Sequence, residues 1–252
     1  MSKGEKLSAE AEEKLNKRDG ILSTLFGYDS PRPIHRTSNK SQRMEEAAEL
    51  YSAAGNAFRL ENNAEASGKA YTQAGVLFEK LNRGFDAADR YVTASSSLRK
   101  LPCQINAYST AKRCLLNVAT ISANFEDYPK AIEIYEKVSH QFDSQYARET
   151  ANDALLKYGA PEYAFKACLC HLCFGDITNA RIACDRLALD VPAFCDTRDY
   201  TLLCALMEAV DQEDEEGFGD AIAEYDKIKR VDPWTTRLIS KFKSSAFQVD
   251  LR

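Results

Sequence analysis

The sequence has little of what a β-sheet domain or an enzyme would require. Glycine (11) and proline (7) are scarce among 252 residues, while 44% of the residues are hydrophobic, a balance that favours helices in a folded soluble protein. No stretch alternates polar and apolar residues, so no segment is predicted to be a strand. The chain also lacks a Gly-x-x-x-x-Gly-Lys phosphate loop, a nucleophile with its base and paired carboxylates. We therefore expect neither an enzyme nor a cofactor.

Excess positive charge and long apolar runs are also missing. The formal net charge is −5, which excludes the basic field that non-specific nucleic-acid binding needs. No window approaches the roughly 20 apolar residues of a membrane span. The first 18 residues mix charges of both signs without an apolar run, so they do not predict a signal peptide. We expect a cytoplasmic protein.

Eight cysteines are present, but not in the short secreted frame of a disulfide scaffold. They are interpreted as reduced, buried thiols. Cys168, Cys170, His171 and Cys173 are the residue types of a zinc site. On a helix, however, residues two apart point about 200° away from each other, so the first two cannot share a metal. We expect no metal, and we interpret the cysteines as small apolar residues of a helix interface.

A repeat organises the first half of the chain. The segments Tyr51–Phe58, Tyr71–Phe78 and Tyr91–Leu98 follow one template at steps of 20 residues. In each, an aromatic residue, a small residue three positions on and a large apolar residue four beyond that form one helical stripe. Polar turns separate the segments, and Gly84 is predicted to be the left-handed residue that ends a helix.

A second template recurs further along, in Tyr128–Val138 and Phe218–Ile228. It is the first-helix pattern of a tetratricopeptide-like repeat. Such helices bury their apolar stripes only by stacking, so the fold class is predicted to be an all-α, right-handed solenoid of helical hairpins. Helices are expected near 44–61, 64–82, 85–100, 105–124, 129–142, 145–158, 161–174, 176–189, 197–212, 217–229 and 232–246.

Three regions are expected along the chain. Residues 1–43 combine an amino-terminal helix, an apolar loop and a flexible segment, the last because 27–43 hold two prolines and almost no apolar residue. Residues 44–190 form the solenoid, and residues 191–252 form a carboxyl-terminal helical bundle with a flexible tail. Trp234 is expected to pack within the last helix pair, and His171 to be buried and neutral.

The second half of the chain carries an ordered set of motifs: Leu155–Tyr158, Tyr163–His171, Pro192–Arg198, Glu224–Asp226, Asp232–Thr236 and Asp250–Arg252. This set resembles the alpha-type soluble NSF attachment proteins, and the resemblance covers nearly the whole chain. The resemblance implies an adaptor that lies along an assembled SNARE complex and recruits and stimulates the hexameric ATPase NSF for SNARE disassembly in vesicle fusion. It also implies weak peripheral contact with membranes.

The resemblance assigns three groups of residues. Basic and polar residues would face the SNARE complex, namely Arg113, Tyr158 and Arg198. Acidic residues and the penultimate leucine would face NSF, namely Asp176, Glu208, Asp211 and Leu251. An apolar loop would touch the membrane through Ile21, Leu22, Leu25 and Phe26, which could give weak, reversible contact but no anchoring.

The chain departs from the family pattern between Lys100 and Ala111. Members carry roughly one to two additional hairpins there, whereas this chain passes through in about ten residues. Two other functions therefore stay open: a generic tetratricopeptide scaffold that binds peptide tails, and a short, non-productive form that competes with a full-length adaptor. The acidic residues from Asp211 to Asp220 also have two interpretations, a solvated face or a docking patch.

Overall fold

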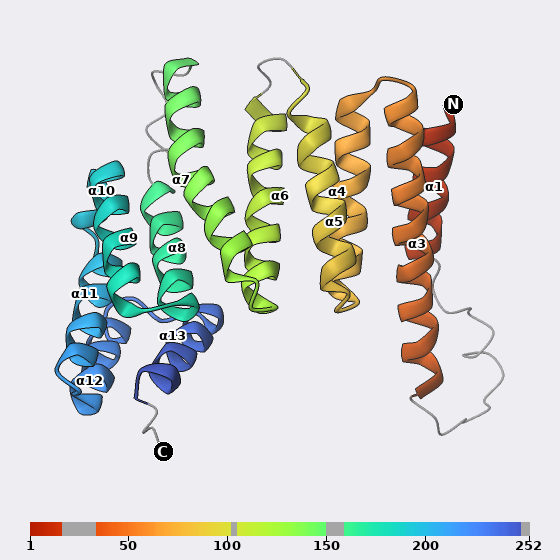
Figure 1. The fold of residues 1–252 in the computed structure, drawn as a ribbon. Helices are drawn as coiled ribbons and strands as arrows, with labels where there is room; N and C mark the ends of the chain where they lie inside the picture. Colours follow the sequence, from red (N-terminus) through yellow and green to blue (C-terminus); the bar gives the residue numbers. More distant parts are fainter. Residues whose placement is uncertain (17–33, 102–104, 150–158, 248–252) are drawn as a thin grey trace. The chain divides into compact units, whose positions relative to one another are not determined.

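The structure is a computed structural model that describes residues 1–16, 34–101, 105–149 and 159–247. Within these ranges every regular element is an α-helix, and most helices pack against the next helix along the chain (Figure 1). This confirms the predicted all-α class of stacked hairpins; the right-handed sense of the solenoid stays a prediction. The chain divides into two compact units, Met1–Ile121 and Ser122–Arg252.

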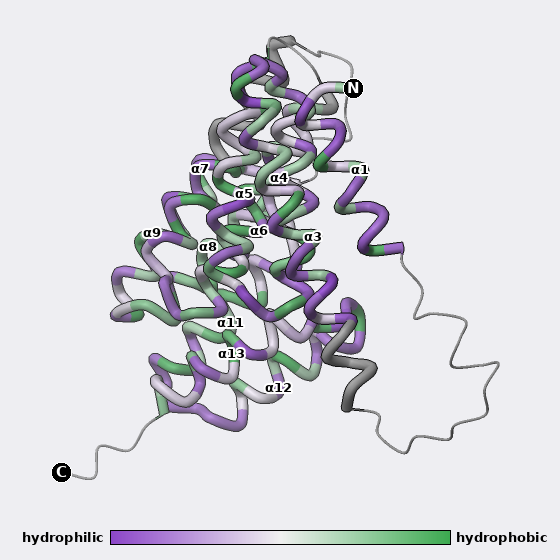
Figure 2. Tube along the Cα trace, turned by 90° about the vertical axis from the view of Figure 1, so that its right-hand side faces the viewer, coloured by the Kyte–Doolittle hydropathy of each residue, from purple (hydrophilic) through white to green (hydrophobic). Residues whose placement is uncertain are grey.

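The first unit is a row of antiparallel helices. Its members are α1 (Lys3–Asn16), α3 (Ile34–Leu60), α4 (Ala64–Lys80), α5 (Gly84–Leu98) and most of α6 (Ile105–Asn124). Helix α1 is largely hydrophilic (Figure 2) and buries only Gly4 and Ala11. It docks on α3 because Gly4 lies flat against the ring of Phe58 and Lys14 forms an ion pair with Glu46.

The tyrosine template determines how these helices pack. Tyr71 and Tyr91 are each 1% exposed, and each ring lies against a glycine of the preceding helix. A Cβ atom on Gly55 would stand 2.9 Å from the ring of Tyr71, and one on Gly75 would stand 2.8 Å from the ring of Tyr91. The glycine that directly follows the small residue of the template is therefore the contact surface for the aromatic residue of the next repeat.

Four of the turns between helices share one geometry. A residue with positive φ ends the helix in four turns: Asn62 (57°), Asn82 (58°), Glu126 (64°) and Glu213 (55°). The N–H of the residue after it donates back to a carbonyl five residues earlier, at 2.8 to 2.9 Å, which closes a Schellman motif. In three of the four turns that same residue caps the next helix with its side chain, namely Asn63, Asp127 and Asp214.

The second unit contains the remaining helices. They are α7 (Tyr128–Glu149), α8 (Ala160–Phe174), α9 (Ile177–Asp190), the short α10 (Pro192–Cys195), α11 (Arg198–Asp211), α12 (Glu215–Asp226) and α13 (Pro233–Ala246). The order is not purely sequential, because α13 returns to pack against α8. There Trp234 meets Tyr135 of α7 edge to face, with ring centroids 6.1 Å apart. Trp234 therefore links the last helix to α7, beyond the last helix pair where it was expected.

Three details of the predicted helices were wrong. Residues 34–43 are the beginning of α3, not a loop, because helix growth from a packed segment is favourable where no proline or glycine intervenes. Helix α7 continues to Glu149 without the predicted break near 143, since that stretch also contains neither residue. Asn82, not Gly84, takes the left-handed conformation; asparagine tolerates it, and Gly84 begins α5.

The thiols follow the prediction only in part. Cys114, Cys168, Cys170 and Cys184 are buried, and burial raises the pKa of Cys114. Cys195 and Cys204, in contrast, are exposed, because they lie on the outer sides of α10 and α11. His171 is half-buried rather than buried, and its Nε2 lies 2.9 Å from Oε1 of Glu136.

Candidate functional site

Two of the basic and polar residues assigned to the SNARE complex can be placed. Arg113 is exposed on α6, and the next residue, Cys114, turns inward to contact the hydroxyl of Thr72 on α4 at 3.4 Å. The packing of α6 on α4 thus directs the guanidinium of Arg113 to solvent. Arg198 is the exposed first residue of α11. It belongs to the second unit, whereas Arg113 belongs to the first.

The acidic residues assigned to NSF gather at one end of the second unit. Asp176 is the exposed residue before α9, while Glu208 and Asp211 are exposed in the last turn of α11. An ion pair joins Arg181, in the first turns of α9, to Asp211. The start of α9 and the end of α11 are therefore neighbours.

Part of the acidic run that follows has structural partners. The carboxylate of Asp214 accepts the N–H of Gly217 at 2.9 Å and caps α12, and Glu215 forms an ion pair with Lys243 at 2.9 Å. The negative surface at this end consequently rests on fewer carboxylates than the sequence suggests. The three-residue spacing from Asp214 to Gly217 is the capping signal that could have shown this.

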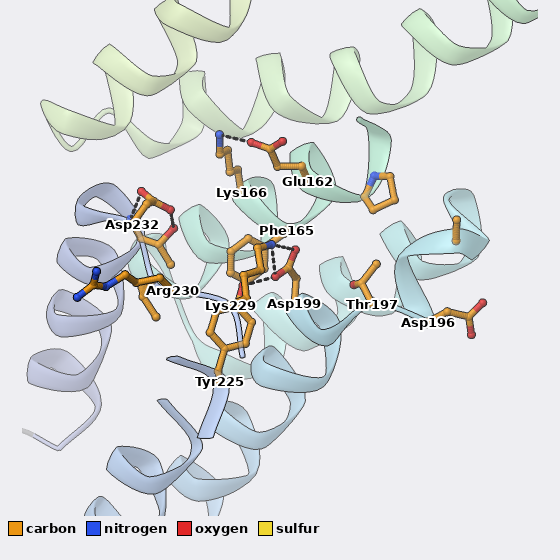
Figure 3. A pocket seen from close by; sticks show the side chains of 14 residues that line it. Glu162, Phe165, Lys166, Asp196, Thr197, Asp199, Tyr225, Lys229, Arg230 and Asp232 are labelled. Atoms are coloured by element: carbon orange, nitrogen blue, oxygen red, sulfur yellow. Dashed lines mark hydrogen bonds and ion pairs between the residues drawn. The ribbon is translucent and has the colours of Figure 1, made fainter. Parts of the chain in front are cut away.

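A cavity of about 720 Å³ opens in the second unit (Figure 3). It lies between the start of α8, the joint of α10 and α11, and the connector from α12 to α13. Its wall comprises Pro161, Glu162, Phe165, Lys166, Ala193, Asp196, Thr197, Asp199, Tyr225, Lys229, Arg230, Val231, Asp232 and Thr235. Arg198 stands between two of these residues along the chain.

A buried carboxylate connects the start of α11 with α12 and the connector that follows it, on one wall of the cavity. Asp199 is 6% exposed; both its oxygens accept from Nζ of Lys229 at 2.8 Å, and Oδ1 also accepts from the hydroxyl of Tyr225. Burial and the bond to Asp199 raise the pKa of Tyr225 to about 12. Burial lowers the pKa of Lys229, but the hydrogen bonds to Asp199 and Tyr225 and the negative charge of Asp199 together outweigh it, so the pKa is raised.

No pattern in the sequence indicates this cluster. Asp199 and Lys229 are separated by 30 residues, and neither lies in a pattern typical of an ion pair, which would place the two charges three or four residues apart on one helix. Only the chain's return from α12 to α13 brings Lys229 to the start of α11. In the described part of the chain, no group of histidine, cysteine, aspartate or glutamate could hold a metal ion.

Several assigned residues lie outside the described part of the structure. They are Tyr158, Leu251 and the four apolar residues Ile21, Leu22, Leu25 and Phe26. No helix that is described is both long and apolar enough to cross a membrane.

Comparison with known proteins relates these features to a family. The sequence profile "Soluble NSF attachment protein, SNAP" matches residues 2–108 and 101–246. The alpha-soluble NSF attachment protein of Mus musculus is 30% identical over 295 aligned residues, covering 95% of this chain and 93% of that protein. The beta-soluble NSF attachment protein of Bos taurus is 30% identical, covering 95% and 92%. A probable vesicular-fusion protein of Neurospora crassa is 28% identical, covering 84% and 89%.

The alignments also locate the departure from the pattern. An alignment of 295 residues is longer than the 252 residues of the chain, so the relatives contain residues that this chain lacks. The profile matches in two segments that meet at 101–108, at the joint of α5 and α6. With matches that together span almost every residue, the chain belongs to the soluble NSF attachment protein family.

Proposed function

We propose that this protein is an adaptor that binds assembled SNARE complexes and recruits and stimulates NSF for their disassembly. Membership of the family carries the proposal, since the relatives are named for NSF attachment and vesicular fusion. Stacked helical hairpins are a type of structure whose surfaces commonly bind protein partners. The protein itself performs no chemistry in this proposal and acts in the cytoplasm, with peripheral association to membranes.

Arg113 and Arg198 are the proposed contacts to the SNARE complex. Both are exposed arginines on helices whose other faces are packed, as a docking surface requires. Tyr158 is the third proposed contact. Because the two arginines are positively charged, an acidic helical bundle would be attracted to them over a long range.

The acidic end of the second unit is the proposed contact to NSF. Asp176, Glu208 and Asp211 are exposed there, and carboxylates attract a basic partner and speed the encounter. Asp211 already has Arg181 as a partner, so Glu208 and Asp176 contribute the larger share. The penultimate residue, Leu251, is proposed to stimulate ATP hydrolysis.

A pull-down with assembled SNARE complex and NSF tests the adaptor function. The wild-type protein should form a ternary complex, and Arg113→Glu should weaken SNARE binding. Lys80→Glu is the matched control. Lys80 is exposed at the end of α4 in the same unit, and its replacement changes the net charge by the same amount as Arg113→Glu. Equal SNARE binding by both variants, or peptide-tail binding that ignores Arg113, would instead support the generic scaffold.

The NSF contact and the tail need separate measurements. Glu208→Lys should reduce NSF recruitment, while Glu224→Lys, exposed on α12, should not. Leu251→Ala should lower stimulated ATP hydrolysis and leave SNARE binding intact; loss of both together contradicts its assigned role. NSF recruitment without disassembly is the signature of the non-productive form.

The membrane contact is tested with liposomes. Ile21, Leu22, Leu25 and Phe26 should make disassembly faster on SNARE-bearing liposomes than in detergent solution. Replacing all four with serine should remove that difference and leave the rate in solution unchanged. An identical rate on liposomes for both proteins removes the membrane claim.

A further inference from the structure

The polar side chains inside the cavity of the second unit satisfy one another. Asp199 is bound to Lys229 and Tyr225, and Lys166 pairs with Glu162 at 2.8 Å. Asp232 accepts the N–H groups of Trp234 and Thr235 at the start of α13, at 3.0 and 3.1 Å. A small polar ligand would find no buried group in need of a hydrogen bond here, which is unlike a typical polar binding site.

The surface left for a ligand inside the cavity is apolar. Phe165, 4% exposed, and the ring of Tyr225 lie toward the interior (Figure 3), and Val231 and Ala193 also line the cavity. A volume of about 720 Å³ falls in the usual range of a binding cleft, roughly 300 to 1,000 Å³. Such a cleft suits an apolar anchor surrounded by a polar rim.

Among the several charged residues of the wall, Arg230 and Asp196 are opposite charges on opposite sides of the cavity. Figure 3 places Arg230 on one side of the cavity and Asp196 on the other. Both are exposed, and neither forms an ion pair with a residue in the described ranges. A complementary partner therefore presents an acid at one end and a base at the other, with an apolar residue between them.

We propose that this cavity receives an apolar side chain of the helical partner, flanked on the partner by an acidic residue that faces Arg230 and a basic residue that faces Asp196. The inference rests on the proposed SNARE-binding function. Arg198, a proposed contact, begins α11 between the cavity residues Thr197 and Asp199, so the cavity extends the same contact region. Because the two rim charges differ, the partner helix can dock in one direction only.

Binding of assembled SNARE complex, measured by fluorescence anisotropy, tests the cavity. Ala193→Trp should fill it, and Arg230→Glu and Asp196→Lys should each oppose one rim contact. Each variant should raise Kd about threefold to tenfold, as expected for charged and anchor positions of an interface. Matched controls make the same changes at exposed positions of α12 and its end outside the cavity: Ala223→Trp, Lys227→Glu and Glu224→Lys. These should change Kd less than twofold, and all variants should unfold like the wild type when unfolding is followed by far-ultraviolet circular dichroism.

The double variant Arg230→Glu/Asp196→Lys separates local contact from net charge. It keeps the net charge of the protein, so the proposal predicts binding at least as weak as that of either single variant. Recovery to the wild-type Kd would show that only net charge matters and would overturn the inference. If Arg113→Glu weakens binding while every cavity variant binds normally, the inference is wrong and the adaptor function stands. If the wild type does not bind SNARE complex, both fail.

Discussion

Replacing Gly75 with alanine should destabilise the first unit, although alanine is the better helix former. The added Cβ would stand 2.8 Å from Cε1 of Tyr91, so the ring must retreat by about 0.6 Å to reach a contact of 3.4 Å. Tyr91 has little freedom to do so. It is 1% exposed, and its hydroxyl donates to Oε2 of Glu79 at 2.8 Å.

Two opposing contributions decide whether Gly75→Ala lowers or raises the free energy of unfolding. Overpacking of this kind costs about 1–3 kcal/mol, whereas exchanging glycine for alanine within a helix gains about 1 kcal/mol. The expected net change is therefore a loss of about 1 kcal/mol, and at most about 2 kcal/mol. The pair Gln73→Gly and Gln73→Ala measures the gain alone, because Gln73 is exposed on the same helix.

Urea unfolding followed by far-ultraviolet circular dichroism gives the free energies, and hydrogen exchange of α4 and α5 peptides assigns them to this unit. If Gly75→Ala stabilises the protein by as much as the difference between Gln73→Gly and Gln73→Ala, Tyr91 does not pack tightly on Gly75 and the reasoning is refuted. A second test adds Tyr91→Leu. Because the smaller side chain leaves room for the Cβ, the two changes should be less harmful together than their sum, by about 1 kcal/mol.

Three further results are expected. Asp199→Asn should destabilise the second unit by about 1–3 kcal/mol, since it breaks the pair between the buried Asp199 and the half-exposed Lys229. Unfolding followed by tryptophan fluorescence measures this loss, and an unchanged free energy of unfolding would contradict it. Burial raises the pKa of Asp232, but the hydrogen bonds from the start of α13 outweigh it and the pKa lies below the ordinary 3.8. The ionised carboxylate of Asp232 therefore stabilises α13 fully above pH 3.8. Asp232→Ala should lower the free energy of unfolding by about 1 kcal/mol at neutral pH, and this difference should become smaller only as the pH falls below 3.8. A difference that already becomes smaller at about pH 6 would contradict this reasoning. Maleimide should modify exposed Cys195 within minutes and buried Cys168 only on unfolding, as peptide mass spectrometry would show; equal rates would contradict the burial.

The tyrosine template shows how much of the fold could be predicted. Because aromatic, small and large residues recur at fixed spacing, Tyr51, Tyr71 and Tyr91 indicated both the helices and their buried stripe, and all three are buried. The helix ends were harder, since Asn82 and Gly84 both suit a left-handed residue and only the length of α4 decides between them. Sequence periodicity reports a face of a helix but not its last residue.

For the candidate site, the sequence indicated which side chains are exposed but not which distant side chains come into contact. Arg113 is exposed as expected, because its neighbour on the buried stripe, Cys114, fixes the orientation of α6. The cluster of Asp199 with Lys229 could not be foreseen, since it depends on α13 returning to α8 and drawing the preceding connector with it. Contacts between segments far apart in a chain require a topology, which local patterns do not supply.

The hairpin turns have a consequence for how such a chain can change its length. Each of the four turns with a positive-φ residue is closed by a hydrogen bond spanning five residues and, in three of them, by a cap from the same short stretch, so it needs no support from distant parts of the protein. A whole pair of helices could therefore be deleted or duplicated and leave the flanking joints intact, provided that the new neighbours match aromatic ring to small residue. An array of this kind varies in length by complete modules, and its span along a partner changes in steps of one hairpin.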